Sequence, residues 1–176
     1  MTGSMSIEPD SKDWTWVITS PCPECGLDVS KVPYDDIPAL LRANAASWEE
    51  LLLRSGIAQR PRPDVWSPLE YACHVRDVFR LFDRRLVRML TEDDPLFDNW
   101  DQDATAVEDR YADQVPTLVA GDLVTAAAAL AERFAAVPPD GRSRPGRRSD
   151  GASFTVESFA RYLLHDPVHH LHDVSG

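Results

Sequence analysis

The sequence predicts an all-α protein: a four-helix bundle preceded by an irregular N-terminal arm. Apolar residues recur at three- and four-residue spacing in four long stretches from residue 35 onward. Prolines, glycines and capping residues separate these stretches. Residues 1–34 lack this period, so we divide the chain into an arm (1–34) and a bundle (35–176). A chain of 176 residues is long enough for one domain with a sizeable core.

The first two helices have recognisable ends. We predict the first over residues 35–55, with acidic residues and a proline at its start and Gly56 at its end. The second begins at Ser67, where Ser67 to Glu70 form a capping box with proline at the first helical position. His74 lies at one edge of its apolar stripe, where it faces a cleft between helices or serves as a hydrogen-bonded structural residue.

The third helix is predicted to begin near Ala104, to break at Pro116 and to restart after Gly121, with Asp122 as its cap. An acidic loop precedes it over residues 93–103. This loop lacks the regular spacing that calcium ligands need, so we interpret it as packing.

A long turn-rich connection, residues 138–154, leads to the last helix and contains Arg142, Arg144, Arg147 and Arg148. Four clustered arginines on an acidic protein could receive a carboxylate or phosphate of a small ligand. The alternative is a solvated loop that its charges keep soluble.

The last predicted helix, Thr155 to Val174, holds four of the chain's five histidines within eight positions. At about 100° per residue, its apolar residues gather into one stripe, made of Val156, Phe159, Leu163 and Val174. Asp166 and His170 lie on or beside this stripe. They are one turn apart, so both side chains can reach one ion.

A buried carboxylate beside a buried imidazole is costly unless the two groups are paired or bind a metal. His74 is the third group that we expect to join Asp166 and His170. Pro167 lies between the two and cannot donate a backbone hydrogen bond, so a kink or a freed carbonyl is expected there. We therefore predict a metal site of His74, Asp166 and His170, and we assign no catalytic or cofactor-binding residue.

Two other interpretations of these histidines stay open. His165 and His169, on the far side of the helix, are a competing pair at the same spacing and would make an all-histidine site. Alternatively the histidines, His172 among them, coat a solvated final turn and bind no metal.

The arm contains a C-x₂-C turn, CPECG from Cys22, in which two thiolates can bind one zinc ion. Half of a site is a weak signal, because the remaining Cys73 lies far along the chain on a predicted helix. A zinc completed by histidine, by Cys73 or by a second subunit is one hypothesis. We favour a reduced or reversibly oxidised pair of thiols.

Charge and hydropathy exclude several function classes. The net charge is −11 and the sequence pI about 4.8, so the electrostatic attraction that drives nucleic-acid binding is missing. No apolar run is close to the length that a transmembrane helix needs, which is about 18 residues. The first residues lack the basic and apolar regions of a signal peptide. We expect a soluble, cytoplasmic protein with a small-molecule substrate, no nucleic-acid partner and no membrane.

Two motifs carry a resemblance to a known family. WSPLEYACHVRDV (66–78) and LLHDPVHHLHDV (163–174) resemble the DinB-like superfamily, which includes mycothiol-dependent maleylpyruvate isomerases and bacillithiol transferases. The resemblance covers roughly residues 35–176 and rests on these short motifs, with little beyond helical pattern elsewhere.

In that family, a histidine of the second helix and an i, i+4 pair on the fourth bind a divalent metal, often zinc or nickel. The resemblance maps the histidine to His74 and the pair to Asp166 and His170, followed by Asp173 and Val174. The family pair is two histidines or glutamate with histidine. Asp166 departs from this pattern, and because it is shorter than glutamate, the metal would sit closer to the backbone or bind weakly.

The resemblance implies thiol chemistry: a low-molecular-weight thiol such as mycothiol, bound to zinc or nickel as the thiolate, attacks an electrophile. The protein would then be a metal-dependent transferase or isomerase. One alternative is a metal-dependent hydrolase on the same site, with Glu70 and Asp77 as the nearest candidates for a general base. Another is a stress-associated bundle that binds a metal or ligand without catalysis. A homodimer is compatible with all three.

Overall fold

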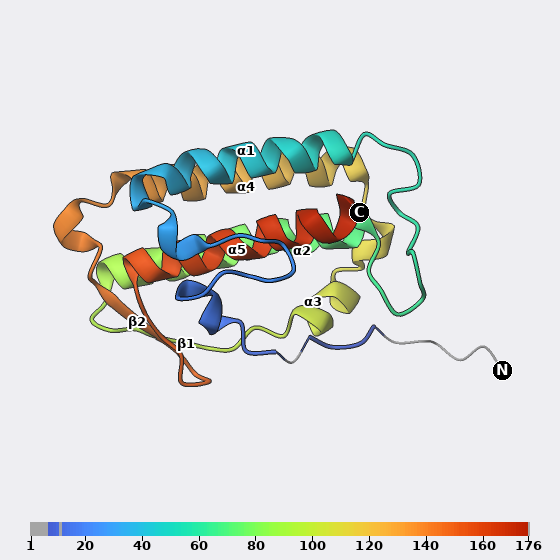
Figure 1. Cartoon of the computed structure of the whole chain (residues 1–176). Coiled ribbons are helices and arrows are strands. Elements are labelled where there is room, and N and C mark those ends of the chain that lie inside the picture. The colour runs from blue at the N-terminus through green and yellow to red at the C-terminus, as the bar shows by residue number, and fades with distance from the viewer. Residues whose placement is uncertain (1–6, 11, 176) are drawn as a thin grey trace.

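Four long helices form the bundle in the computed structural model, which describes residues 7–10 and 12–175 (Figure 1). They are α1 (Ile37–Leu51), α2 (Pro68–Thr91), α4 (Pro116–Ala136) and α5 (Val156–Ser175). Both α4 and α5 pack against α1 and α2, so the order around the bundle is α1, α4, α2, α5. The prediction of an all-α four-helix bundle is confirmed.

The core lies between these helices, and each contributes a large aromatic side chain. Trp48, Phe79, Phe134 and Phe159 come from α1, α2, α4 and α5 and are fully buried. Burial of one such side chain stabilises the fold by about 1.5–3 kcal/mol. Asn44 adds a polar link between helices, because its buried amide donates to the carbonyl of Pro167 at 3.1 Å. Pro167 lies within α5, which continues past it without a break.

The capping box at the start of α2 is formed as predicted. The Ser67 hydroxyl accepts from the backbone N–H of Glu70 at 3.2 Å, and the Glu70 carboxylate accepts from the N–H of Ser67 at 2.8 Å. Arg60 binds the same carboxylate through two guanidinium nitrogens. These contacts fix the first turn of the helix that carries His74.

The prediction for the third helix is correct at its start, near Ala104, and wrong at its break and restart. A separate short helix, α3 (Gln102–Glu108), is capped by Asp101, and α4 begins only at Pro116. Proline at the first helical position loses no helical hydrogen bond, so Pro116 opens a helix instead of breaking one. α4 then continues through Gly121, and the expected cap, Asp122, lies inside the helix and pairs with Arg80.

The predicted loop at residues 138–154 contains part of a small sheet. β1 (Leu96–Phe97) is parallel to β2 (Pro145–Arg148), which is antiparallel to β3 (Ser153–Thr155), in the order β1-β2-β3. Gly146 lets β2 approach α2 closely, because a Cβ at this position would lie 2.9 Å from Cγ of Met89. The sheet meets α5 at its first turn (Figure 1).

The arm runs along α5 (Figure 1). Its short 3₁₀ turns, Thr15–Ile18 and Val29–Lys31, pack against α5, and a third, Tyr34–Asp36, leads into α1. Arg161 on α5 holds the arm through a hydrogen bond to the carbonyl of Val32 at 3.1 Å. The boundary at residue 34 stays a prediction.

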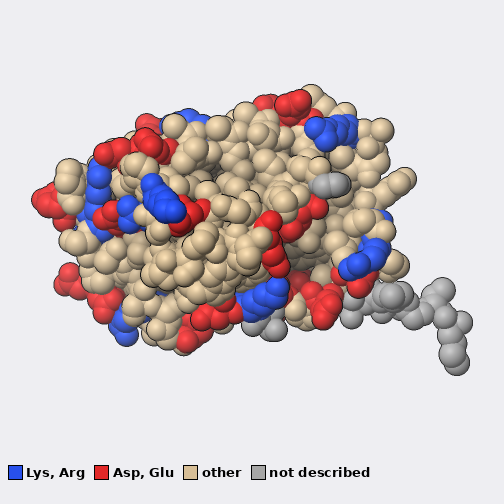
Figure 2. Space-filling model, in the orientation of Figure 1, with Lys and Arg blue, Asp and Glu red and all other residues tan. Residues whose placement is uncertain are grey.

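Acidic and basic side chains are interspersed on the face shown in Figure 2, where lysines and arginines lie next to carboxylates. Within residues 7–10 and 12–175, no helix combines the length and the apolar character needed to cross a bilayer.

Replacement of Ser67 by alanine tests the cap of α2. We expect Ser67→Ala to lower the free energy of unfolding by about 1 kcal/mol, because the N–H of Glu70 loses its acceptor. Urea denaturation measures the change. The matched control is Ser47→Ala, an exposed serine inside α1 whose loss should change the free energy by less than about 0.5 kcal/mol. Equal effects of the two substitutions would contradict the capping role.

Candidate metal centre

Helices α2 and α5 bring His74, Asp166 and His170 together. The Nε2 atoms of His74 and His170 each lie 3.5 Å from Oδ2 of Asp166. The two imidazole rings meet edge to face, with centroids 5.0 Å apart. One candidate ligand atom from each residue lies within 4.8 Å of the others. The three residues predicted to form the site are therefore neighbours, and their role as ligands stays a prediction.

The distances within this cluster fit a shared cation. A hydrogen bond between a charged imidazole and a carboxylate is about 2.7–2.9 Å long, shorter than the 3.5 Å seen twice here. Two ligands bound tetrahedrally at about 2.1 Å from zinc lie about 3.4 Å apart. Each imidazole is thus spaced from the carboxylate as two ligands of one ion would be.

Buried polar atoms without partners also mark this cluster. Nδ1 of His74 and Oδ1 of Asp166 are buried and have no hydrogen-bond partner among the described residues. Trp100 stacks on the His74 ring, with centroids 5.5 Å apart and 8° between the planes, and Trp66 lies tilted against it at 5.4 Å. An unpaired buried polar atom costs free energy unless something binds it. A cation shared by the cluster would bind the carboxylate of Asp166, whereas Nδ1 of His74 is not the nitrogen that faces Asp166.

Asp173 orients the ring of His170 through Nδ1, the nitrogen that does not face Asp166. Nδ1 of His170 lies 3.3 Å from Oδ2 of Asp173, and the ring packs against Tyr71 at 4.9 Å. A carboxylate on the far nitrogen of an imidazole fixes the tautomer and the direction of a metal-ligating histidine. Nε2 of His170 is thereby directed at Asp166.

The electrostatics of this cluster favour a positive charge. Burial raises the pKa of Asp166, but the imidazoles of His170 and His74 outweigh it and hold this pKa well below its usual value. Burial also lowers the pKa of His170, and the opposing charge of Asp166 outweighs it and raises the pKa to about 9. Asp166 is therefore ionised at neutral pH and attracts a cation, either a proton on His170 or a metal ion that displaces this proton.

The cluster lies in the wall of a cavity of about 1190 Å³. The cavity reaches from α2 and α5 to the arm, where Trp14 is part of the wall, and to α3, where Asp103 is. Of the four arginines at 142–148, Arg148 contributes to the lining, together with Arg85 of α2. Ligand sites typically measure about 300–1,000 Å³, so this one has room for two small molecules.

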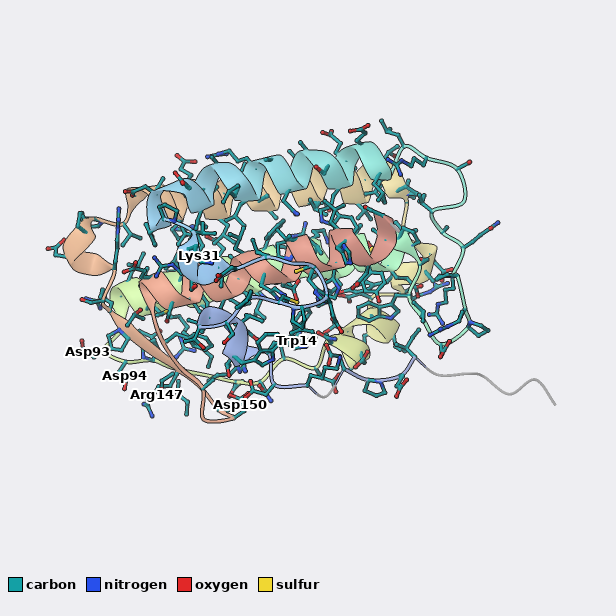
Figure 3. The ribbon with its side chains drawn as sticks, viewed as in Figure 1. Trp14, Lys31, Asp93, Asp94, Arg147 and Asp150 are labelled. Atoms are coloured by element: carbon teal, nitrogen blue, oxygen red, sulfur yellow. The ribbon has the colours of Figure 1, made fainter. Side chains whose placement is uncertain are left out.

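The remaining arginines of the 142–148 segment bind the protein itself. Arg142 pairs with Asp35, Arg144 donates to backbone carbonyls at the end of α2, and Arg147 pairs with Asp94. Figure 3 shows Arg147 close to Asp94 at the outer end of the sheet. These contacts explain the three arginines without a ligand.

His165 and His169 do not join His74. They are 4% and 7% exposed and lie against the arm, where one ligand atom from each lies within 4.8 Å of those of Cys22 and Cys25. The geometry therefore does not support the all-histidine site. Burial lowers the pKa of both histidines, that of His165 to about 4. The solvated-turn interpretation holds for the exposed His172.

The two proposed general bases do not reach the cavity. Glu70 is held by Ser67 and Arg60, and Asp77 accepts from the hydroxyl of Tyr111 and pairs with the adjacent Arg76.

Asp103 is the carboxylate that sequence reasoning missed. It lines the cavity, and burial raises its pKa. Its place in the sequence, at the end of an acidic loop, did not indicate a site residue, because only the tertiary fold brings Asp103 near His74.

Comparison with known proteins shows the family of this chain and a solved structure with a similar fold. A sequence model of the DinB superfamily matches residues 40–174, which is most of the chain. The chain belongs to the DinB superfamily. Among solved structures, YfiT from Bacillus subtilis, described as a probable metal-dependent hydrolase with an unusual four-helix bundle topology, matches with a TM-score of 0.64. At 15% identity over 97% of this chain and 92% of YfiT, the likeness shows the fold. No curated protein sequence matches the chain.

Removal of one imidazole tests the metal centre of this DinB-superfamily chain. We expect His170→Ala to bind one equivalent of zinc fewer than the wild type, because two remaining ligands hold an ion weakly. Elemental analysis after dialysis measures the content, and circular dichroism checks the fold. His172→Ala, an exposed histidine on the same helix, should retain the wild-type content. Unchanged zinc in His170→Ala would refute the assignment.

Proposed function

We propose that the protein is a metal-dependent transferase or isomerase that uses a low-molecular-weight thiol such as mycothiol. His74, Asp166 and His170 hold the ion, zinc or nickel. The observation that carries the proposal is the position of this cluster in the wall of a large cavity. Two imidazoles and one carboxylate leave coordination positions free for a substrate. When bound, such a metal lowers the pKa of a coordinated thiol or water and polarises a carbonyl.

The engagement of Glu70 and Asp77 by other groups favours a thiol over water as nucleophile, and Asp103 remains as a base only for the second candidate below. Glu70 and Asp77 are engaged by other groups and lie outside the cavity lining. A thiol ionises near pKa 8.5, whereas bulk water ionises near 15.7. A thiol bound at a metal therefore needs no additional base, and the cavity has room for a thiol and its electrophile together.

Arg85 supports an acidic group on one of the two substrates. Its side chain is 7% exposed, and its one hydrogen bond goes to the carbonyl of Asp98 at 2.7 Å. Burial, followed by repulsion from Arg148, lowers its pKa to about 10. Among the described residues no carboxylate pairs with Arg85, so this buried cation at the cavity suits a carboxylate or phosphate of the substrate.

Turnover with a thiol tests the proposed reaction. We expect the zinc- or nickel-loaded protein to consume mycothiol with an alkylating electrophile, or to isomerise maleylpyruvate with mycothiol released again after each turnover. His170→Ala should be slower by at least about 100-fold, because the thiol then loses its activating ion. His172→Ala should keep the wild-type rate. Absence of turnover in fully loaded wild-type protein, with mycothiol and with bacillithiol, would refute the proposal.

A metal-dependent hydrolase is the second candidate, favoured by the structural likeness to YfiT and by Asp103 in the cavity lining. Asp103 would then serve as the general base for an attacking water. Turnover of esters or amides without any thiol, and its loss in Asp103→Asn, would favour this candidate over the first.

Replacement of Arg85 tests the acidic-substrate requirement. We expect Arg85→Gln to raise KM for an acidic electrophile by about 10- to 100-fold, since one charge-assisted hydrogen bond contributes about 1.5–3 kcal/mol. Steady-state kinetics with an acidic electrophile and its amide separate this effect from a loss of kcat. The adjacent exposed Arg84, replaced by glutamine, is the matched control. Equal KM changes for the acid and the amide would contradict the role.

A further inference from the structure

The arm and α5 bring four more metal ligands together, apart from the cluster at the cavity. We propose that Cys22 and Cys25 of the arm and His165 and His169 of α5 bind a second zinc ion, which fixes the arm to the bundle. One ligand atom from each residue lies within 4.8 Å of the others. Two cysteines two residues apart with two histidines four apart are a ligand set typical of structural zinc, closed by protein on all four positions.

The cysteine turn is already shaped for a metal. Gly26 has φ of +76° and donates its N–H to the carbonyl of Cys22 at 2.8 Å, and the N–H of Cys22 donates to the carbonyl of Leu27 at 2.9 Å. These bonds close the loop, and the two sulfurs lie within 4.8 Å of one another and of the histidine nitrogens. Both cysteines are free thiols in the structure.

The distances and the unpaired atoms agree with a tetrahedral ion. Sγ of Cys22 lies 3.7 Å from Nδ1 of His169. Sulfur at about 2.3 Å and nitrogen at about 2.05 Å from zinc lie about 3.6 Å apart in a tetrahedral site. Nε2 of His165 is buried and has no hydrogen-bond partner among the described residues. A zinc ligated at this atom satisfies it.

Outer carboxylates orient the fourth ligand. Nε2 of His169 lies 3.3 Å from Glu24 and 3.6 Å from Asp173, which leaves Nδ1 directed at Cys22. This is the arrangement that carboxylates make with metal-bound histidines. Two thiolates balance the charge of the dication, so the loaded site is neutral and tolerates its burial.

The ion gives the arm a structural role at the cavity. Trp14 packs against His165 and His169, with ring centroids at 5.3 and 5.0 Å, and also lines the cavity. Figure 3 shows Trp14 on the side of α5 that the arm covers. An ion held by residues of the arm and α5 therefore holds one wall of the cavity in place. This inference does not depend on the reaction proposed above.

Cobalt spectroscopy on the full chain tests the site directly. Metal-free, reduced wild-type protein titrated with Co²⁺ should show thiolate-to-cobalt charge-transfer absorption, since the cluster at the cavity has no sulfur ligand. Cys22→Ser and Cys25→Ser should each lose this absorption and one equivalent of zinc. Cys73 lies in the core on α2, so Cys73→Ser should retain the charge-transfer absorption and the full zinc content. Folded wild-type protein that binds cobalt without the charge-transfer absorption, or whose two cysteines form a disulfide before and after zinc addition, would overturn the proposal.

Proteolysis tests the anchoring of the arm. The chain has lysine only at positions 12 and 31, both in the arm, so cleavage by a lysine-specific protease reports on the arm. Zinc at 100 times its dissociation constant should slow cleavage after Lys31 by about 100-fold, because cleavage needs local opening. The protection should persist in His170→Ala, which keeps the second site, and vanish in Cys25→Ser. Protection that is lost in His170→Ala and kept in Cys25→Ser would contradict the inference.

Discussion

The candidate site depends on the helical spacing of α5, which presents two pairs of candidate ligands on adjacent faces. His165 and His169 are one turn apart, as are Asp166 and His170, and the two pairs differ by about 100° around the axis. One pair is directed at α2 and the other lies under the arm, and all four side chains belong to the lining of the cavity. Six consecutive residues of α5 thereby supply candidate ligands to two clusters, and the rigidity of the helix fixes their separation.

Sequence reasoning was sufficient where local pattern determines geometry. The capping box at Ser67 sets the start of α2, and the helical wheel of α5 selects Asp166 and His170 as neighbours of His74. It was insufficient where tertiary contact decides. Cys22 lies 147 positions from His169, and no periodicity in the arm indicates which face of α5 it covers.

Backbone chemistry explains the other errors. A proline breaks a helix when it is internal and opens one when it is at the first helical position. The residues around Pro116 do not distinguish these two cases, and in the structure Pro116 opens α4. The strands β2 and β3 are short, and β2 carries proline, glycine and two arginines, so their pattern is that of a loop. β2 pairs with β1, about fifty residues earlier in the chain, and β3 pairs with β2.

Asp173 links the two clusters physically. Its Oδ2 lies 3.3 Å from Nδ1 of His170 and 3.6 Å from Nε2 of His169, so one carboxylate faces the outer nitrogen of a candidate ligand in each cluster. A hydrogen bond from one imidazole reduces the basicity that the carboxylate offers to the other. Asp173 therefore lies between the two clusters and contacts one candidate ligand of each. In the DinB bundle this makes the arm an electrostatic neighbour of the cavity as well as a part of its wall.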